Sequence, residues 1–125
     1  MFYIADITAC MILDSAGGRT LSVSVTSSDG VVGRAGVPHG TSCGSAEAPD
    51  VTAGSAVAQV HTHFRAALVK TDYADHASFD VRLRGIAAEA SEEIGVSALL
   101  AVSVAAAECA ATTRDQELWR YLAES

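Results

Sequence analysis

Hydrophobic and polar residues alternate strictly along "RTLSVSVTSSDG", in the first third of the chain. Leu21, Val23 and Val25 fall on one side, and serine and threonine residues fall on the other. This period of two predicts a strand over 19–27 with one buried face and one wet face. The Ser-Asp-Gly triplet at its end predicts a turn, because glycine adopts positive φ without strain.

Two further strands are predicted beside this one. The segment "FYIADITACMIL" predicts a longer strand over 2–13, and "DSAGG" supplies the turn that joins it to 19–27. The segment "VVGRAGV" predicts a return strand over 31–37, which Pro38 ends because proline cannot donate to the sheet. The three segments together predict an antiparallel meander.

Beyond residue 50 the spacing of apolar residues becomes helical. A first helix is predicted over 55–69, and its apolar face consists of Val57, Val60, Phe64 and Leu68. Gln59, His63 and Arg65 are expected to turn away from that face. A second helix is predicted over 75–90, with an inner face of Phe79, Leu83, Ile86 and Ala90.

The second helix has a candidate N-cap in Asp72 or Asp75, because a short carboxylate accepts hydrogen bonds from first-turn amides. A third helix over 96–111 is apolar on nearly every side, and its small residues allow close approach of its neighbours. A last amphipathic helix is predicted over 114–123. Strands followed by helices predict an α+β fold, a three-stranded meander with three to four helices, in one domain over 1–125.

The composition limits the function classes. Half of the 125 residues are hydrophobic and 18% are charged, so a disordered chain is excluded. The formal net charge is −7 and only eight residues are lysine or arginine, which argues against nucleic acid as a partner.

The cysteines indicate the cellular compartment, and the apolar runs indicate whether a segment can span a membrane. Cys10, Cys43 and Cys109 form no CxxC pair, so neither a zinc ribbon nor a disulfide framework is indicated, and we expect a cytoplasmic protein. The N-terminus lacks the basic region of a signal peptide. The longest uncharged apolar run, 94–107, is shorter than the roughly 20 residues of a membrane span, so we expect a buried helix and no membrane partner.

Histidines are the first candidates for chemistry. His61 and His63 lie two positions apart, so on a helix they point to opposite sides and are not expected to share a metal ion. His76 lies near a helix start among several aspartates, and we interpret it as a solvated imidazole. The sequence contains no glycine-rich phosphate loop at a helix start, no GxSxG motif and no defensible Ser/His/Asp order.

The segment 38–50, "PHGTSCGSAEAPD", is the least ordinary part of the chain. Its residues are almost all small or polar, which predicts a mobile loop with exposed hydroxyl groups. Cys43 lies within it, and the nearest basic residue in sequence is His39. We interpret Cys43 as an inert small side chain.

Several segments resemble one family. "ILDSAGGRTLSVSV" and "GRAGVPHGTSCGSAEA" resemble the enolase pattern Ile-Leu-Asp-Ser-Arg-Gly-Asn-Pro-Thr, Val-Glu-Val and Gly-Arg-Ala-x-Val-Pro-Ser-Gly-Ala-Ser-Thr-Gly. "DYADHASFD", "IGVSALLAVSVAAAECAA" and "LWRYLA" resemble later enolase segments in the same order. The chain therefore resembles the amino-terminal domain of enolase, phosphopyruvate hydratase, over its whole length.

The resemblance implies a role for the 38–50 loop. In enolases this loop is a mobile lid over the active site, and its serine is a ligand of the second magnesium ion once substrate is bound. That serine is Ser42 here, and Gly40 and Gly44 would be the lid hinges. The base, the acid and the magnesium carboxylates of an enolase all lie in a barrel outside this domain. The resemblance therefore implies no catalytic residue in this chain, and magnesium only in a site completed by a barrel.

The chain also departs from the family pattern. The arginine of Asp-Ser-Arg is Ala16, the following Asn-Pro pair is Gly18-Arg19, and the serine after proline is His39. The threonine after the ligand serine is Cys43, a lysine of the last long helix is Glu108, and the segment after Ala48 is shorter than usual.

Three functions stay open on this basis. The chain could be a lid or capping subunit of an enolase-type magnesium-dependent lyase, a glycolysis-related hydratase whose catalytic barrel is a separate protein. It could instead be a non-catalytic, enolase-derived protein interaction module, or a piece of a longer enolase-like enzyme. The expected partners are an enolase-type barrel or a second copy of the chain.

Overall fold

A curled antiparallel sheet is the scaffold of the computed structural model, which describes residues 2–37 and 51–124. Within these residues four strands pair in the order β3-β2-β1-β4. Their bounds are β1 Phe2–Leu13, β2 Arg19–Ser27, β3 Val32–Gly36 and β4 Thr71–Tyr73. The first three strands form the meander that the sequence predicts.

The short strand β4 is not predicted by the sequence. It pairs with the first residues of β1, Phe2↔Tyr73 to Ile4↔Thr71, and the amide of Lys70 donates to the carbonyl of Ile4 over 2.7 Å. Three residues are too few to establish an alternating pattern. Pairing with the distant start of β1 creates this strand, and local sequence does not encode it.

The β1–β2 hairpin turns where the sequence predicts. Gly17 has φ +82, and the carboxylate of Asp14 accepts hydrogen bonds from the amides of Gly18 and Ala16 over 2.7 and 3.0 Å. Gly30, with φ +84, makes the predicted turn between β2 and β3. The two turns fix the register that places Leu21, Val23 and Val25 on one face, where all three are fully buried.

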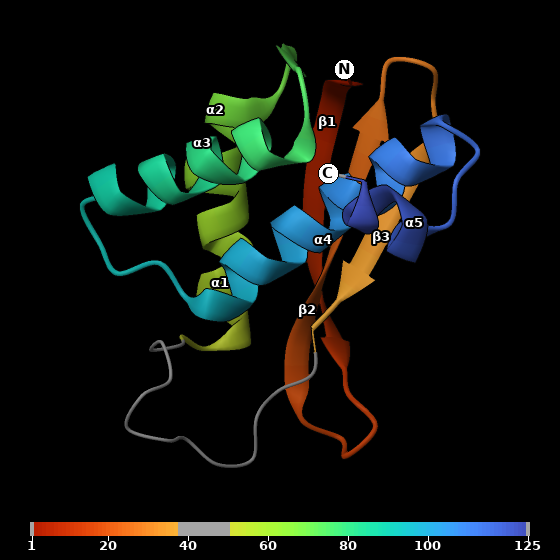
Figure 1. The fold of residues 1–125 in the computed structure, drawn as a ribbon. Helices are drawn as coiled ribbons and strands as arrows, with labels where there is room; N and C mark the ends of the chain where they lie inside the picture. Colours follow the sequence, from red (N-terminus) through yellow and green to blue (C-terminus); the bar gives the residue numbers. More distant parts are fainter. Residues whose placement is uncertain (1, 38–50, 125) are drawn as a thin grey trace.

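Helices follow the sheet, so the α+β fold class is confirmed. Their bounds are α1 Ala53–Gln59, η1 Val60–Arg65, α2 Ala66–Leu68, α3 His76–Glu89, α4 Val96–Thr113 and α5 Leu118–Ala123. The first three are consecutive parts of one helical stretch, in which η1 is a π-helix. The helices gather on one side of the sheet, and the β1–β2 hairpin projects beyond them (Figure 1).

Helices α1 and α3 each begin with a side-chain cap. The carboxylate of Asp75 accepts a hydrogen bond from the amide of Ser78 over 2.8 Å, so Asp75 is the N-cap of α3. This confirms one of the two caps that the sequence offers. The hydroxyl of Thr52 accepts from the amide of Ser55 over 3.2 Å and caps α1 in the same way.

Helix α4 packs closely against the sheet at Gly33. A Cβ atom at this position would lie 2.3 Å from both the carbonyl oxygen of Ala105 and the amide nitrogen of Cys109. The small side chains of α4 allow this contact, and Ala101, Ala105 and Ala106 are fully buried. The close approach expected from the small residues of this helix is therefore confirmed.

Helix α4 is also long and apolar enough to cross a bilayer, since its 18 residues have a mean hydropathy of 1.6. In the fold, 56% of it is buried, and it lies across β2 and β3 (Figure 1). Burial in a protein core accounts for the same composition. Length and hydropathy alone are thus weak evidence for a membrane span here.

The structure corrects the predicted inner face of the first helix. Gln59 is expected to turn away from the core, but its exposed fraction is only 4%. Ala56 and Gln59 are the buried residues of α1, and their spacing of three places them on one face of the helix. The side chain of Gln59 is satisfied there, because it donates to the carbonyl of Glu93 and accepts from the amide of Gly95.

Candidate functional site

The predicted metal ligand Ser42 and the predicted hinges Gly40 and Gly44 lie outside the described residues, as do His39 and Cys43. The structure does place the residues on either side of 38–50. On one side, Gly36 ends β3 beside the Ile12 side chain, whose Cδ1 would be 3.2 Å from a Cβ at Gly36. On the other, Thr52 begins α1. Both ends are therefore next to the β1–β2 hairpin.

A hollow lies between the hairpin and the start of α1. Its volume is about 600 Å³, and its lining consists of Met11, Gly18, Arg19, Thr52, Ala53 and Gly54. A second hollow of about 450 Å³ shares two of these residues and is lined by Met11, Ile12, Leu13 and Arg19. The hairpin thus offers a concave, mostly apolar surface with one cation, Arg19, at the end of the sheet that holds the 38–50 segment.

The end of β1 is unusually apolar for a surface. The exposed fractions of Met11, Ile12 and Leu13 are 52%, 37% and 69%. A run of consecutive exposed apolar residues is a defect in a free-standing protein unless it has a function. We call these three residues the hairpin surface.

The hairpin surface also has a free backbone edge. The amide of Ala9 points away from β2, because it donates to Nε2 of His61 over 3.2 Å. Alternate residues in a strand share this direction, so Met11 and Leu13 also direct their backbone groups outward. Within the described residues, β4 covers β1 only at Phe2–Ile4. Over 2–37 and 51–124, no strand pairs with β1 on this side beyond Ile4.

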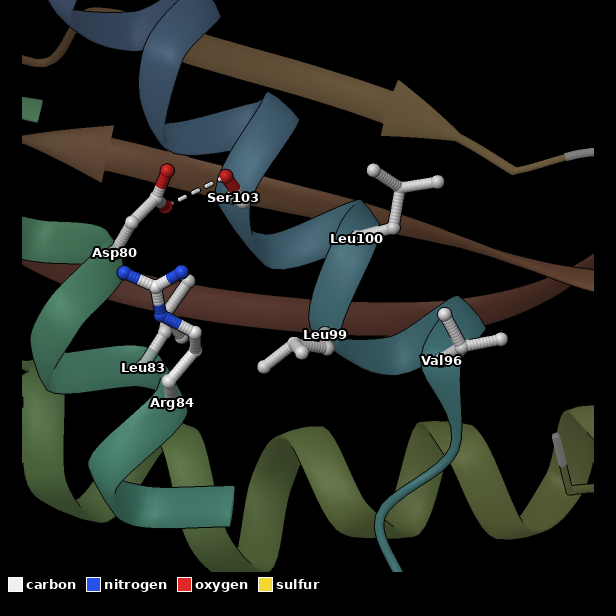
Figure 2. Close-up of a pocket in the computed structure, with 7 residues that line it drawn as sticks. All are labelled: Asp80, Leu83, Arg84, Val96, Leu99, Leu100 and Ser103. Carbon is white, nitrogen blue, oxygen red and sulfur yellow. Dashed lines mark hydrogen bonds between the residues drawn. The ribbon is translucent and has the colours of Figure 1, made fainter. Parts of the chain in front are cut away.

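A second cluster joins α3 to α4. The hydroxyl of Ser103 donates to Oδ1 of Asp80 over 2.7 Å (Figure 2) and lies 3.3 Å from Nε2 of His76. That same nitrogen lies 3.4 Å from Oδ2 of Asp80. His76 is only 6% exposed and packs against the rings of Phe79 and Tyr121. The interpretation of His76 as a solvated imidazole is therefore wrong.

Helix phase explains the error. Asp75 caps α3, so His76 is the first helical residue and lies one turn before Phe79 on the inner face. Burial lowers the pKa of His76, and the nearby carboxylates of Asp80 and Asp75 only partly oppose this. The ring is therefore held in its neutral form at neutral pH.

This Ser/His/Asp cluster does not have the geometry of a nucleophilic relay. In such a relay, the histidine contacts serine with one ring nitrogen and the carboxylate with the other. Here Nε2 of His76 faces both Ser103 and Asp80, and buried Nδ1 has no hydrogen-bond partner in the described part of the chain. The cluster ties α3 to α4 and has no second acceptor to orient the ring.

The other histidines act separately. His61 accepts the amide of Ala9, while His63 lies 3.6 Å from a carboxylate oxygen of Glu92. The two rings therefore contact different parts of the fold. Over 2–37 and 51–124 no group of three histidine, cysteine, aspartate or glutamate residues could hold an ion.

Cys109 is a structural thiol. It is 2% exposed, its Sγ donates to the carbonyl of Val31 over 3.4 Å, and burial raises its pKa. A buried, protonated thiol is unreactive. Cys10 is exposed.

The comparison with protein families now decides the fold family. The family model described as "Enolase, N-terminal domain" matches residues 4–122. This chain belongs to the enolase N-terminal domain family. The match confirms the resemblance noted in the sequence, and it covers every strand and helix described above except the first two residues of β1 and the last residue of α5.

Magnesium requires several oxygen ligands in near-octahedral geometry. Within residues 2–37 and 51–124 no three carboxylate or imidazole side chains are grouped so that they could hold an ion. The family resemblance implies a single serine oxygen, that of Ser42, which lies outside the described residues.

The sequence does not predict two features of the structure. The Asp80–Ser103–His76 cluster joins residues up to 27 positions apart, and only the packing of α3 on α4 reveals it. Gln59 is the second feature, because its buried side chain binds Glu93 and Gly95, which are 34 and 36 positions away and leave no local signal.

Proposed function

We propose that this enolase N-terminal domain protein is a non-catalytic capping subunit, which docks on a separate enolase-type barrel and completes a magnesium-dependent lyase site. The observation that carries the proposal is the hairpin surface, Met11 to Leu13, beside both ends of the 38–50 segment. A partner that covers this surface is brought against the segment that contains Ser42.

The exposed area supports docking rather than chance exposure. Burying a leucine side chain contributes about 1.5–3 kcal/mol, so covering Leu13 and Met11 together would contribute several kcal/mol to association. Depletion of charged residues at the core of a patch is typical of protein interfaces. Arg19, at the rim of the hollow, adds one cation that a carboxylate of the partner can meet.

In the docked complex, Ser42 would provide one oxygen ligand to magnesium held by carboxylates of the barrel, and Gly40 and Gly44 would be the hinges of its loop. This assignment rests on the family resemblance. The chain itself provides docking and this one hydroxyl group, while proton transfer belongs to the barrel.

The proposal is tested by association with an enolase-type barrel that lacks its own N-terminal domain. We expect binding that Leu13→Asp weakens by about tenfold or more, since the loss of one buried leucine is 1.5–3 kcal/mol and a charge is added. Val81→Asp is the matched control, because Val81 is 62% exposed on α3, away from the hairpin. Isothermal titration calorimetry measures both, and circular dichroism checks folding.

The outcomes separate the alternatives. Equal weakening by both substitutions, or by neither, contradicts docking through the hairpin surface. If Leu13→Asp abolishes a homodimer of the chain and no barrel binds, the hairpin serves self-association and the protein is an interaction module.

A further inference from the structure

A separate hollow lies between α3 and α4, away from the hairpin surface. Its volume is about 250 Å³, and it is lined by Asp80, Leu83, Arg84, Val96, Leu99, Leu100 and Ser103. Figure 2 shows the side chains of α3 on one side of it and those of α4 on the other. The capping role proposed above uses none of these residues.

The walls of the hollow are apolar. Leu83, only 1% exposed, forms its floor, and Val96 and Leu100 are 37% and 50% exposed along α4. Val96, Leu99 and Leu100 fall at positions i, i+3 and i+4 of α4, so they form a continuous stripe on one side of that helix. An exposed stripe beside a buried leucine is a surface on which an alkyl chain can lie.

The charges of the hollow are not equivalent. The carboxylate of Asp80 accepts the hydroxyl of Ser103 with one oxygen and lies 3.4 Å from Nε2 of His76 with the other, while 38% of its side chain is exposed. Arg84 is exposed and forms no ion pair in the part of the chain that the structure describes. The free charge at the rim is thus a guanidinium, which matches the geometry of a carboxylate.

We propose that this hollow binds a small amphipathic anion, an alkyl carboxylate whose chain lies between Leu83 and Leu100 and whose head meets Arg84. Its volume lies just below the range of about 300–1,000 Å³ typical of drug-sized ligands, which suits roughly ten non-hydrogen atoms. With the efficiency expected for such small ligands, the dissociation constant is about 1 mM or tighter.

Because of the net charge of the molecule, a preference for an anionic ligand would be evidence for a role of Arg84. The chain has a formal charge of −7, so its overall field favours cations over anions. A preference for an anionic ligand at this place can arise only from a local cation, and Arg84 is the cation that lines the hollow.

The test uses the whole chain and three eight-carbon probes: octanoate, octan-1-ol and octylammonium. Nuclear magnetic resonance titration follows the backbone amides of Leu99, Leu100 and Ser103. We expect saturable shifts at these amides and the tightest binding for octanoate. We expect Arg84→Gln to weaken octanoate by about threefold to tenfold, the range of an exposed charge-assisted contact, and to leave octan-1-ol unchanged.

Two further variants complete the design. Arg82→Gln removes an exposed arginine of α3 that does not line the hollow, and it should leave all three affinities unchanged. Leu100→Asp should abolish octanoate binding while the circular dichroism spectrum is retained. No saturable shift at α4, equal or tighter binding of octylammonium, or equal losses for the two arginine variants would each overturn the proposal.

Discussion

Substitution of Gly33 by alanine tests the packing that holds the sheet to its main helix. The added Cβ would lie 2.3 Å from the carbonyl oxygen of Ala105 and the amide nitrogen of Cys109. Attractive contact between such atoms begins near 3.5 Å, so α4 or β3 must move by about 1 Å. Both obstructing atoms belong to the backbone of a buried helix and cannot rotate away as a side chain would.

The magnitude follows from this geometry. Overpacking a core costs about 1–3 kcal/mol and occasionally more, and a clash with backbone on two sides belongs at the upper end. We expect Gly33→Ala to lower the free energy of unfolding by about 3 kcal/mol, a large share of the roughly 5–15 kcal/mol of a natural domain. For a chain of this size that corresponds to a fall in Tm of roughly 10 °C.

The matched control is Gly36→Ala in the same strand. The atom nearest to its added Cβ is Cδ1 of Ile12 at 3.2 Å, the mobile end of an exposed side chain. We expect a change below about 1 kcal/mol. Urea denaturation followed by circular dichroism measures both variants. A free energy of unfolding for Gly33→Ala within about 1 kcal/mol of that for Gly36→Ala, roughly the uncertainty of the extrapolation, would refute the close packing of α4 on β3.

Three further predictions concern the core, the pH dependence and the chemistry. Gln59→Ala should lower the free energy of unfolding by about 3 kcal/mol, because two backbone groups lose their partner. These are the amide of Gly95 and the carbonyl of Glu93, which Gln59 binds over 3.0 and 2.9 Å. Thr62→Ala, at an exposed position of η1, should be neutral in the same denaturation experiment. Burial lowers the pKa of His76, so the unfolded state binds the proton more tightly, and stability should fall as pH drops below about 6.5. Urea midpoints measured between pH 7.5 and 5.5 should show this fall, and His76→Gln should make it smaller. The chain alone, with magnesium and 2-phosphoglycerate and free of host enolase, should form no phosphoenolpyruvate above background, and any turnover that resists further purification would contradict the capping role.

The sequence predicts the sheet better than it predicts the helical layer. Strict alternation around Val23 and glycines at tight turns are local signals, and β1 to β3 follow them closely. Strand β4 depends on pairing with the distant strand β1. The burial of Gln59 likewise depends on hydrogen bonds to Glu93 and Gly95, which a local pattern does not reveal.

The candidate site divides in the same way. A resemblance over whole segments identified the family, which the match over 4–122 confirms. The burial of His76 could not be read from its neighbours, because three nearby aspartates suggest solvent while the helix phase sets the side chain against Phe79 and Tyr121. The sequence also does not predict that Met11 to Leu13 are exposed, because apolar residues at the end of a strand usually belong to the core.

The most direct test of the capping role is reconstitution of activity in trans. An enolase-type barrel without its own N-terminal domain is mixed with this chain, magnesium and 2-phosphoglycerate, and phosphoenolpyruvate formation is followed beside a binding measurement. The capping role predicts activity that appears only in the mixture, and that Ser42→Ala lowers while the affinity for the barrel is unchanged, because one magnesium ligand is lost and the hairpin surface is intact. Association without any gain in activity, or no association at all, would contradict it.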